Sequence, residues 1–321
     1  MSPIPVVLLT GFLGSGKTTL LSRFLKCPEF QDSAVIINEA GDVGLDHALL
    51  EQGREDVVVL EGGCICCRMK GSLNDTLVRV LRRAAEQNLP LRRVVVETSG
   101  LTDPAPVLGA LIADPRFVRD FTLAGVTTVI DAVHFDETHA HFPEARMQVA
   151  FADRLLISKA DLVRDAAVRL VADRLSEINQ HADRIVITPN PSDDRLLWID
   201  PLDDAARVAK GLFWASEVSS NIVSASRTFP GQLVYDGVNE WLDDITTLFG
   251  ERLLRLKGIL QIEGVPDAVV LHGVQGLVYS PGTLQKSAVS DDAANAVVLI
   301  ARDIERQDLI DALTRLAHRA V

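Results

Sequence analysis

Short apolar runs alternate with helical patterns over the first two thirds of the chain. Residues 5–9 (PVVLL) precede a glycine-rich turn, and the segment after it, KTTLLSRFLK, has apolar residues at helical spacing. Further apolar, β-branched runs occur at residues 34–37, 57–60, 94–96, 127–130, 155–157 and 185–187. Because these runs are continuously apolar, they predict strands that are buried on both faces.

Helical patterns such as SLNDTLVRVLRRAAEQN and AAVRLVADRLSEIN lie between these runs. Strands that alternate with helices predict an α/β domain with a mostly parallel sheet and right-handed crossovers, which we expect over residues 1–215. The segment that follows, SEVSSNIVSASR at residues 216–227, is polar and poor in periodicity. We interpret it as a connection between two domains.

The last part of the chain has a different order of elements. An amphipathic helix is expected at residues 237–249, and a final helix is expected to end near His318. Strand-like runs lie between them, at residues 258–262, 268–271, 276–279 and 296–301. Clustered strands flanked by helices predict a smaller α+β domain over residues 226–321.

Composition narrows the class of protein. Hydrophobic residues make up 47% of the chain and charged residues 24%, as in globular proteins. The formal net charge of -12 repels polyanions, so we expect no nucleic-acid partner. The apolar stretch near the N-terminus is short and has no basic flank, so we expect no signal peptide, no membrane association and a cytoplasmic location.

The segment GFLGSGKTT has the spacing of a Walker A loop, and it lies between an expected strand and an expected helix. Glycines at 11, 14 and 16 let backbone N–H groups turn inward around a phosphate. Lys17 is expected to bridge the β- and γ-phosphates, and the Thr18 hydroxyl to bind Mg²⁺. The nucleotide-binding set predicted in this loop is Gly11, Gly14, Ser15, Gly16, Lys17, Thr18 and Thr19.

A carboxylate ends a later strand, in the segment RRVVVETSG. Glu97 is expected at the carboxyl edge of the parallel sheet, where it can reach magnesium directly or through water. We therefore predict Lys17, Thr18 and Glu97 as catalytic residues, with Thr18 and Glu97 at the Mg²⁺. The plainer alternative is that Glu97 caps the next helix or pairs with a lysine.

The segment RLLISKADL places Ser158, Lys159 and Asp161 at the end of an expected strand. A carboxylate at Asp161 can accept from N1–H and the exocyclic amino group of guanine, and adenine lacks this pair of donors. An unpaired buried carboxylate is costly, so this pattern favours GTP over ATP. GTPases usually have asparagine where this chain has Ser158, whose shorter side chain can replace it only in part.

Three of the chain's four cysteines form a C-x-C-C array in LEGGCICCRMKGS, between an expected strand and an expected helix. Thiolates at Cys64, Cys66 and Cys67 can converge on one metal, and their softness favours Zn²⁺ or Cu(I). The alternatives are a redox pair or small buried hydrophobes. Cys27 lies far from the array, and we expect it to be a packed thiol.

Two further polar segments stay open on the sequence. Asn38, Glu39 and Asp42 follow the second expected strand, where P-loop GTPases have a switch that senses the γ-phosphate, although an acidic surface loop fits as well. His134, His139 and His141 lie close together in DAVHFDETHAHF, and we expect them to be exposed rather than to bind metal.

The motifs GFLGSGKTT, NEAGDVGLD, GGCICC, ETSGL and SKADL occur in this order, and with it the chain resembles the CobW family of metallochaperone GTPases. The resemblance continues through QVAFADRLLISKADL and into RLLRLKGILQIEG and HGVQGL, so it covers nearly the full length. Arg255 and Lys257 match family positions to which no role is given. The chain departs from the family in Ser158 and in lacking a long histidine-rich stretch.

The resemblance implies a P-loop GTPase that couples GTP hydrolysis to metal delivery, with GTP or GDP, Mg²⁺ and Zn²⁺ as cofactors. It implies that Glu39 joins Cys64, Cys66 and Cys67 as a zinc ligand, and that a client metalloprotein is the partner; a homodimer stays open. Cobalt or iron delivery, for cobalamin synthesis or nitrile hydratase, is an alternative. Others are a kinase and a nucleotide-binding module with a purely structural zinc. With no evident arginine finger beside the loop, we expect slow intrinsic turnover.

Overall fold

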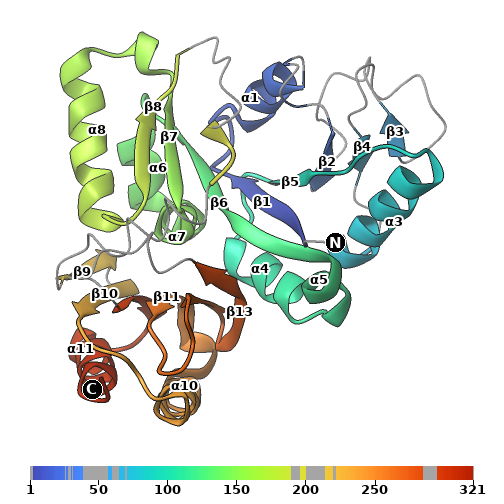
Figure 1. Cartoon of the computed structure of the whole chain (residues 1–321). Helices are drawn as coiled ribbons and strands as arrows, with labels where there is room; N and C mark the ends of the chain where they lie inside the picture. The colour runs from blue at the N-terminus through green and yellow to red at the C-terminus, as the bar shows by residue number, and fades with distance from the viewer. Residues whose placement is uncertain are drawn as a thin grey trace. The chain divides into compact units, whose positions relative to one another are not determined.

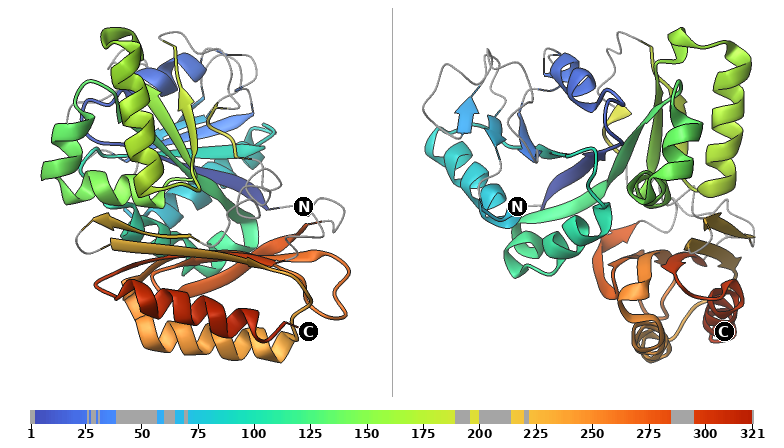
Figure 2. Two further views of the ribbon diagram at one scale, coloured as in Figure 1. Left: turned by 90° about the vertical axis from the view of Figure 1, so that its left-hand side faces the viewer. Right: turned by 180° about the vertical axis from the view of Figure 1, so that it is seen from behind.

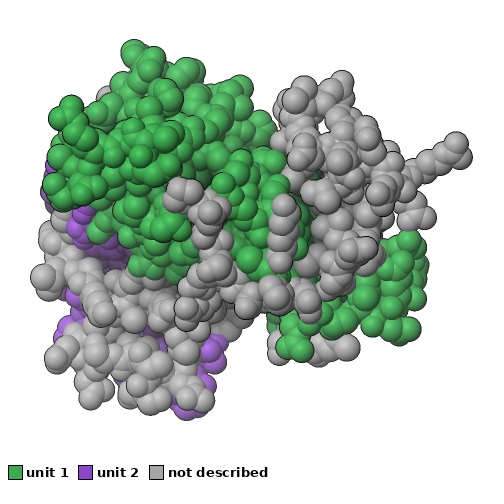
Figure 3. Space-filling model, turned by 90° about the horizontal axis from the view of Figure 1, so that it is seen from above, with its two compact units in different colours: residues 1–104, 113–175, 182–199 green, residues 105–112, 176–181, 200–321 purple. Residues whose placement is uncertain are grey.

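The computed structural model describes residues 3–25, 27, 30, 32–38, 57–59, 65–68, 71–188, 196–199, 214–219, 222–284 and 295–320. The chain divides into two compact units, which Figure 3 colours separately. Unit 1 comprises residues 1–104, 113–175 and 182–199, and unit 2 comprises residues 105–112, 176–181 and 200–321. Each unit has a sheet and a core of its own.

Unit 1 is built on an eight-stranded sheet in the order β3-β4-β2-β5-β1-β6-β7-β8. Every neighbouring pair is parallel except β3 and β4, which are antiparallel. The strands are β1 (Ile4–Thr10), β2 (Ser33–Asn38), β3 (Val57–Val59), β4 (Ile65–Arg68), β5 (Arg93–Thr98), β6 (Phe121–Asp131), β7 (Arg154–Ser158) and β8 (Asp183–Val186). The predicted α/β class is confirmed.

Helices follow most strands of this sheet, and Figure 1 shows α1 on one face and α5 on the other. The chain runs through α1 (Lys17–Phe24), α3 (Leu73–Glu86), α4 (Pro104–Ile112), α5 (Pro115–Asp120), α6 (Phe135–His141), α7 (Pro143–Phe151), the 3-10 turn η2 (Ala160–Leu162) and α8 (Asp165–Ile178). In the core, Leu21 and Phe24 of α1 pack with Val35, Val95 and Val129 of the sheet. Burial of this apolar face holds α1 in place, and with it the loop before it.

Unit 2 is built on a six-stranded sheet in the order β13-β12-β11-β14-β10-β9, all of it antiparallel. Its elements are β9 (Trp214–Ser219), β10 (Ile222–Phe229), α10 (Tyr235–Phe249), η4 (Gly250–Arg252), β11 (Leu253–Leu260), β12 (Ala268–Val274), β13 (Leu277–Leu284), β14 (Asn295–Arg302) and α11 (Arg306–Ala317). Figure 2 shows α10 and α11 side by side on one face of this sheet. Trp241 is fully buried there, and its indole N–H donates to the Ala312 carbonyl over 2.8 Å.

Two sequence expectations need correction. The segment 216–227 is not a connection, because β9 and β10 run through it as an antiparallel pair. The C-x-C-C array does not lie wholly between elements, since Cys66 and Cys67 are part of β4. The limits 1–215 and 226–321 stay a prediction. Of the described helices, none has the length and apolarity to cross a membrane.

Candidate active site

The phosphate loop links β1 to α1 through residues 11–16. Gly11 has a φ of 140°, and a Cβ there would lie 2.3 Å from the Val129 carbonyl oxygen of β6. Gly16 caps α1 with a φ of 100°, in the left-handed region. Only glycine fits the first of these positions, so the loop is turned against β6 before the helix begins.

Lys17 is the first residue of α1, and its side chain folds back over the loop. Its Nζ donates to the carbonyl oxygens of Gly11 at 2.7 Å and Phe12 at 3.2 Å. The ammonium group therefore lies within the curve of the loop. A cation there and the N-terminus of a helix both favour an anion, as nucleotide phosphates require.

Thr18 and Glu97 come from different elements and meet beside this loop. The Thr18 hydroxyl donates to Glu97 Oε1 over 2.6 Å, and Glu97 is 1% exposed at the carboxyl end of β5. One residue further on, Thr98 donates to the Thr10 hydroxyl over 2.9 Å. A hydroxyl and a carboxylate oxygen at this position are ligands that Mg²⁺ prefers, so the residues fit the ion.

The predicted guanine loop follows β7. The Ser158 hydroxyl lies 2.7 Å from the Ser15 carbonyl oxygen of the phosphate loop and 3.0 Å from the Ile130 carbonyl oxygen of β6. A single O–H donor serves one of these acceptors at a time. Ser158 thus reaches the phosphate loop despite its short side chain.

Lys159 adopts a left-handed conformation, with a φ of 56°, and its Nζ donates to Asp131 Oδ2 over 2.7 Å. His134 Nδ1 lies 3.0 Å from the same oxygen. Burial would raise the pKa of Asp131, but the hydrogen bonds from Lys159 and His134 outweigh it and keep that pKa below its ordinary value. Asp131 stays ionised at neutral pH and holds Lys159 at the edge of the site.

The remaining predicted nucleotide ligands surround these contacts. Ser15 is 1% exposed, whereas Gly14 and Thr19 are exposed on the loop and on the first turn of α1. Asp161 is exposed in η2, directly after the Lys159 turn. The predicted phosphate and guanine residues are therefore brought to one edge of the sheet, at the carboxyl ends of β1, β5 and β7.

Comparison with known proteins decides the family. Residues 5–186 match the model of the CobW/HypB/UreG nucleotide-binding domain, and residues 218–317 match the cobalamin synthesis protein CobW C-terminal domain. The chain belongs to the CobW/HypB/UreG family. It is a P-loop GTPase.

Relatives of this GTPase include the zinc chaperone YjiA of Escherichia coli strain K12, 33% identical over 281 residues, which are 86% of this chain and 88% of the relative. The crystal structure of the Zn(II)-bound YjiA GTPase from E. coli superposes with a TM-score of 0.71 at 29% identity, covering 98% of this chain and 99% of that one. A Zn(II)-bound triple mutant of YjiA, with one glutamate and two cysteines replaced by alanine, has a TM-score of 0.72 at 28% identity, with the same coverage.

The predicted zinc ligands are only partly described in this family member. Glu39 and Cys64 lie outside the described residues, and Cys66 and Cys67 are placed by their backbone in β4. Cys66 pairs with Val35 of β2 and Cys67 with Ile36, while Glu97 of β5 pairs with Ile37 of β2. One strand, β2, therefore separates the cysteine strand from the strand that carries Glu97.

Other candidate ligands do not converge. Among the described residues, no group of three or more His, Cys, Asp and Glu side chains is arranged to hold a metal ion. His134 is bound to Asp131, and His139 stacks on Phe135 with ring centroids 5.4 Å apart. His141 is exposed at the end of α6. Cys27 packs against the core and donates to the Arg23 carbonyl over 3.5 Å.

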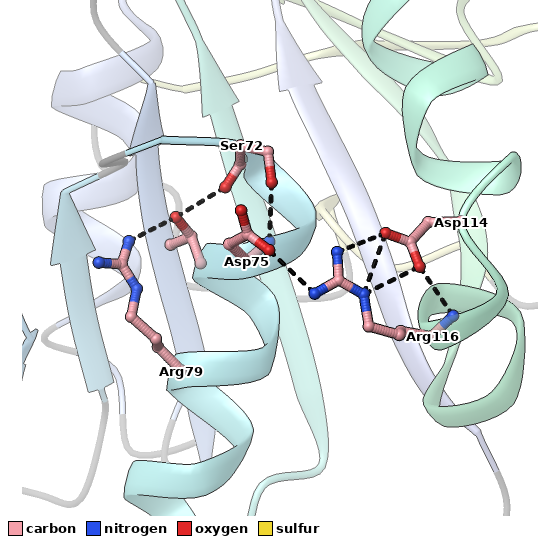
Figure 4. A network of polar contacts seen from close by, with 6 residues as sticks. Ser72, Asp75, Arg79, Asp114 and Arg116 are labelled. Atoms are coloured by element: carbon pink, nitrogen blue, oxygen red, sulfur yellow. Dashed lines mark hydrogen bonds and ion pairs between the residues drawn. The ribbon is translucent and has the colours of Figure 1, made fainter.

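A polar network fixes the start of α3, the helix that follows the cysteine strand (Figure 4). The Ser72 hydroxyl caps the helix by accepting from the Asp75 N–H at 3.1 Å. Arg116 bridges Asp75, at 2.9 Å, and Asp114, at 2.7 Å. The hydrogen bond with Ser72, followed by the one with Arg116, lowers the pKa of Asp75. The chain that leaves β4 is thereby tied to the start of α5.

Sequence reasoning missed the residue that joins α7 to the site. Gln148 is 1% exposed, and its Nε2 donates to the carbonyl oxygens of Gly100 at 3.0 Å and Thr102 at 3.1 Å. A Cβ on Gly100 would lie 2.5 Å from the Leu13 backbone nitrogen. Gln148 therefore clamps the segment after Glu97 against the phosphate loop. Its position ten residues before Ser158, inside QVAFADRLLISKADL, was the available signal.

Proposed function

We propose that this GTPase is a metallochaperone that binds zinc through Cys64, Cys66 and Cys67, with Glu39 as a further ligand, and transfers it to a client metalloprotein. Its nucleotide state would set its zinc affinity. The names of its relatives support this proposal, since they include a zinc chaperone and a Zn(II)-bound GTPase. Soft thiolate ligands suit Zn²⁺, although they also accept cobalt or iron.

One observation carries the coupling between the two sites. Arg68 at the end of the cysteine strand pairs with Ile37, and Ile37 pairs with Glu97 on its other side. Two steps between strands amount to about 10 Å across the sheet. Since Glu97 contacts Thr18, a change at the nucleotide is transmitted along hydrogen-bonded strands to the strand with Cys66 and Cys67.

In the nucleotide site, we propose that the phosphate loop, Lys17 and Thr19 hold the phosphates and that Asp161, with Lys159, selects guanine. Thr18 and Glu97 would hold Mg²⁺, which supplies electrostatic stabilisation of charge on the transferred phosphoryl group. The residues of this chain then position the ion and the phosphates. Asp131 holds Lys159 in place, and Ser158 ties the guanine loop to the phosphate loop.

The test measures zinc affinity by competition with a chromogenic chelator, in the presence of GDP or a non-hydrolysable GTP analogue. The variant replaces Cys64, Cys66 and Cys67 by serine, and Cys27→Ser is the matched control because that thiol packs against the core. We expect the affinity of the wild type and of the control to differ between nucleotides. The triple variant should lose both the high affinity and the nucleotide dependence.

Affinity, rather than the mere presence of zinc, is the right readout, because a relative with a glutamate and two cysteines replaced still binds Zn(II) in its crystal. High affinity that is the same with both nucleotides would mean a structural zinc and would overturn the chaperone proposal. A parallel titration with Co²⁺ addresses the alternative cargo. Tighter nucleotide-dependent binding of Co²⁺ than of Zn²⁺ would replace zinc in the proposal.

A further inference from the structure

A cavity of about 190 Å³ lies beside the phosphate loop of the GTPase, on the side of α6 and α7. Phe12 and Leu13 of the loop form one wall, and Asp131 at the end of β6 lies at another. His139, Phe142 and Gln148 complete the lining from the helices. Most of the wall is apolar, and the rings of Phe12 and Phe142 pack together with centroids 4.5 Å apart.

Gln148 faces this cavity with a defined atom. Its amide nitrogen is identified by two carbonyl acceptors, those of Gly100 and Thr102, so the other amide atom is the oxygen. Within the described part of the chain, that Oε1 is buried and has no hydrogen-bond partner. A buried acceptor without a donor is costly, so the cavity calls for a donor at this point.

The second polar atom in the wall is Nδ1 of His139, which is also buried without a partner among the described residues. Burial first, and then the charges of Arg146 and Arg174, lower the pKa of His139 to about 4, so the ring is neutral at neutral pH. The other ionisable groups in the wall are His134 and the carboxylates of Asp131 and Glu137. Without a lysine or arginine in the wall, the cavity disfavours an anion such as a phosphate.

Size and lining together define the ligand class. An engineered apolar cavity of about 150 Å³ binds benzene, so this space accommodates one aromatic ring with a substituent or a fused ring. We propose that the cavity is a binding site for an uncharged aromatic molecule of one or two rings that carries an N–H or O–H donor. The ring packs on Phe12 and Phe142, and the donor satisfies Gln148 Oε1.

The same glutamine links this site to GTP hydrolysis. Gln148 Nε2 holds the carbonyl oxygens of Gly100 and Thr102, which follow Glu97 in the chain. Leu13 contributes to the cavity wall and lies against Gly100. A ligand that fixes Gln148 and Leu13 therefore stiffens the segment next to the Mg²⁺ residues. The site is regulatory, and it rests on the GTPase activity rather than on metal delivery.

Indole is the probe, and indene, which has the same shape without the N–H, is its matched control compound. Binding to the full chain in the GDP state is followed by ligand-observed NMR, and GTP turnover is measured over the same concentrations. We expect indole to bind about tenfold more tightly than indene, because indene leaves Gln148 Oε1 unpaired. Indole should slow GTP turnover by about twofold or more, with the same half-saturation.

Two variants fill the cavity without touching Gln148. Ala145→Phe on α7 and Thr138→Leu on α6 both add volume to the lining, and both should abolish indole binding and its effect on turnover. His141→Phe adds a ring at an exposed position outside the lining and should behave as the wild type. Thermal unfolding of each variant shows that it is folded.

Three results would overturn the proposal. If indole does not bind up to its solubility limit, there is no site of this class. If indole binds both filled variants as well as the wild type, it binds elsewhere. Binding that leaves GTP turnover unchanged removes the regulatory role. None of these results bears on zinc affinity, so the metallochaperone proposal is tested separately.

Discussion

The Ser158 hydroxyl lies 2.7 Å from the Ser15 carbonyl oxygen, so the end of β7 is hydrogen-bonded to the phosphate loop. Residue 158 begins the predicted guanine loop, and residue 15 belongs to the loop that would hold the phosphates. A side chain that joins both loops fixes the distance between the two ends of a nucleotide. Affinity for the nucleotide, rather than choice of base, should depend on it.

Ser158→Ala removes this link and leaves the Ser15 carbonyl without its donor. We expect the affinity for GDP and GTP to fall about tenfold, with the preference over ATP unchanged, because Asp161 is untouched. Ser158→Asn restores a donor and should bind at least as tightly as the wild type. The measurement is a competition titration against a fluorescent GDP analogue. An alanine variant with unaltered affinity would show that the link is dispensable.

Glu97→Gln tests the Mg²⁺ assignment through the 2.6 Å contact with Thr18. An amide is a much weaker ligand for a hard cation than a carboxylate, so the Mg²⁺ concentration needed for half-maximal GTP turnover should rise. Turnover at saturating Mg²⁺ should fall about tenfold or more. Nucleotide affinity measured in a chelator should stay the same. Glu86→Gln on the exposed side of α3 is the control, and equal Mg²⁺ dependence in both variants would remove Glu97 from the site.

Gly100→Ala places a Cβ 2.5 Å from the Leu13 backbone nitrogen and 2.7 Å from its Cα. Neither backbone atom can move without shifting the phosphate loop, so we expect a lower melting temperature and weaker nucleotide binding. Gly237→Ala is the matched control, since its Cβ would meet nothing closer than 3.7 Å on α10. Alanine should stabilise that helix by about 1 kcal/mol. If both variants melt above the wild type, the close approach at Gly100 is not limiting.

His139 makes stability depend on pH. Its pKa is lowered from 6.5 to about 4, by burial first and then by Arg146 and Arg174. The unfolded chain takes up this proton near pH 6.5, whereas the folded chain takes it up only near pH 4. The contribution of the neutral ring is therefore complete above pH 6.5 and is lost as the pH falls from 6.5 towards 4.

His139→Phe keeps the packing against Phe135 without the titrating group. The midpoint of urea unfolding should fall less steeply with decreasing pH in this variant than in the wild type. His141→Ala, at an exposed position, should keep the wild-type pH dependence. Parallel curves for the wild type and His139→Phe would mean that His139 titrates in the folded chain as it does in the unfolded one.

The sequence predicted the elements whose signal is local. The phosphate loop lies between β1 and α1 as expected, because strand, glycines and helix are contiguous. The pair β9 and β10 was missed because Ser224 and Ser226 alternate with Val223 and Ala225, and polar residues were taken to mean a connection. All four are buried in the folded sheet, so the period of two was the better signal.

The candidate site divides in the same way. Lys17, Thr18, Glu97 and Ser158 were found because each belongs to a motif with fixed spacing. Asp131 and Gln148 were not, because their roles come from contacts with residues that are distant in the chain: Asp131 with Lys159, and Gln148 with Gly100. A polar side chain in a helix such as α7 gives no sign in the sequence of whether it faces solvent or a backbone carbonyl in another loop.

The order of strands across the sheet also bears on biosynthesis. The cysteine strand β4 pairs with β2, and the far edge of β2 pairs with β5, which ends 30 residues later in the chain than β4 does. A ribosome therefore releases Cys66 and Cys67 before it has made the strand that completes their support. Parallel strands distant in sequence also pair late in folding. Newly made chains thus expose bare thiols to oxidants and stray metal ions for a time, and rapid completion of this sheet protects them.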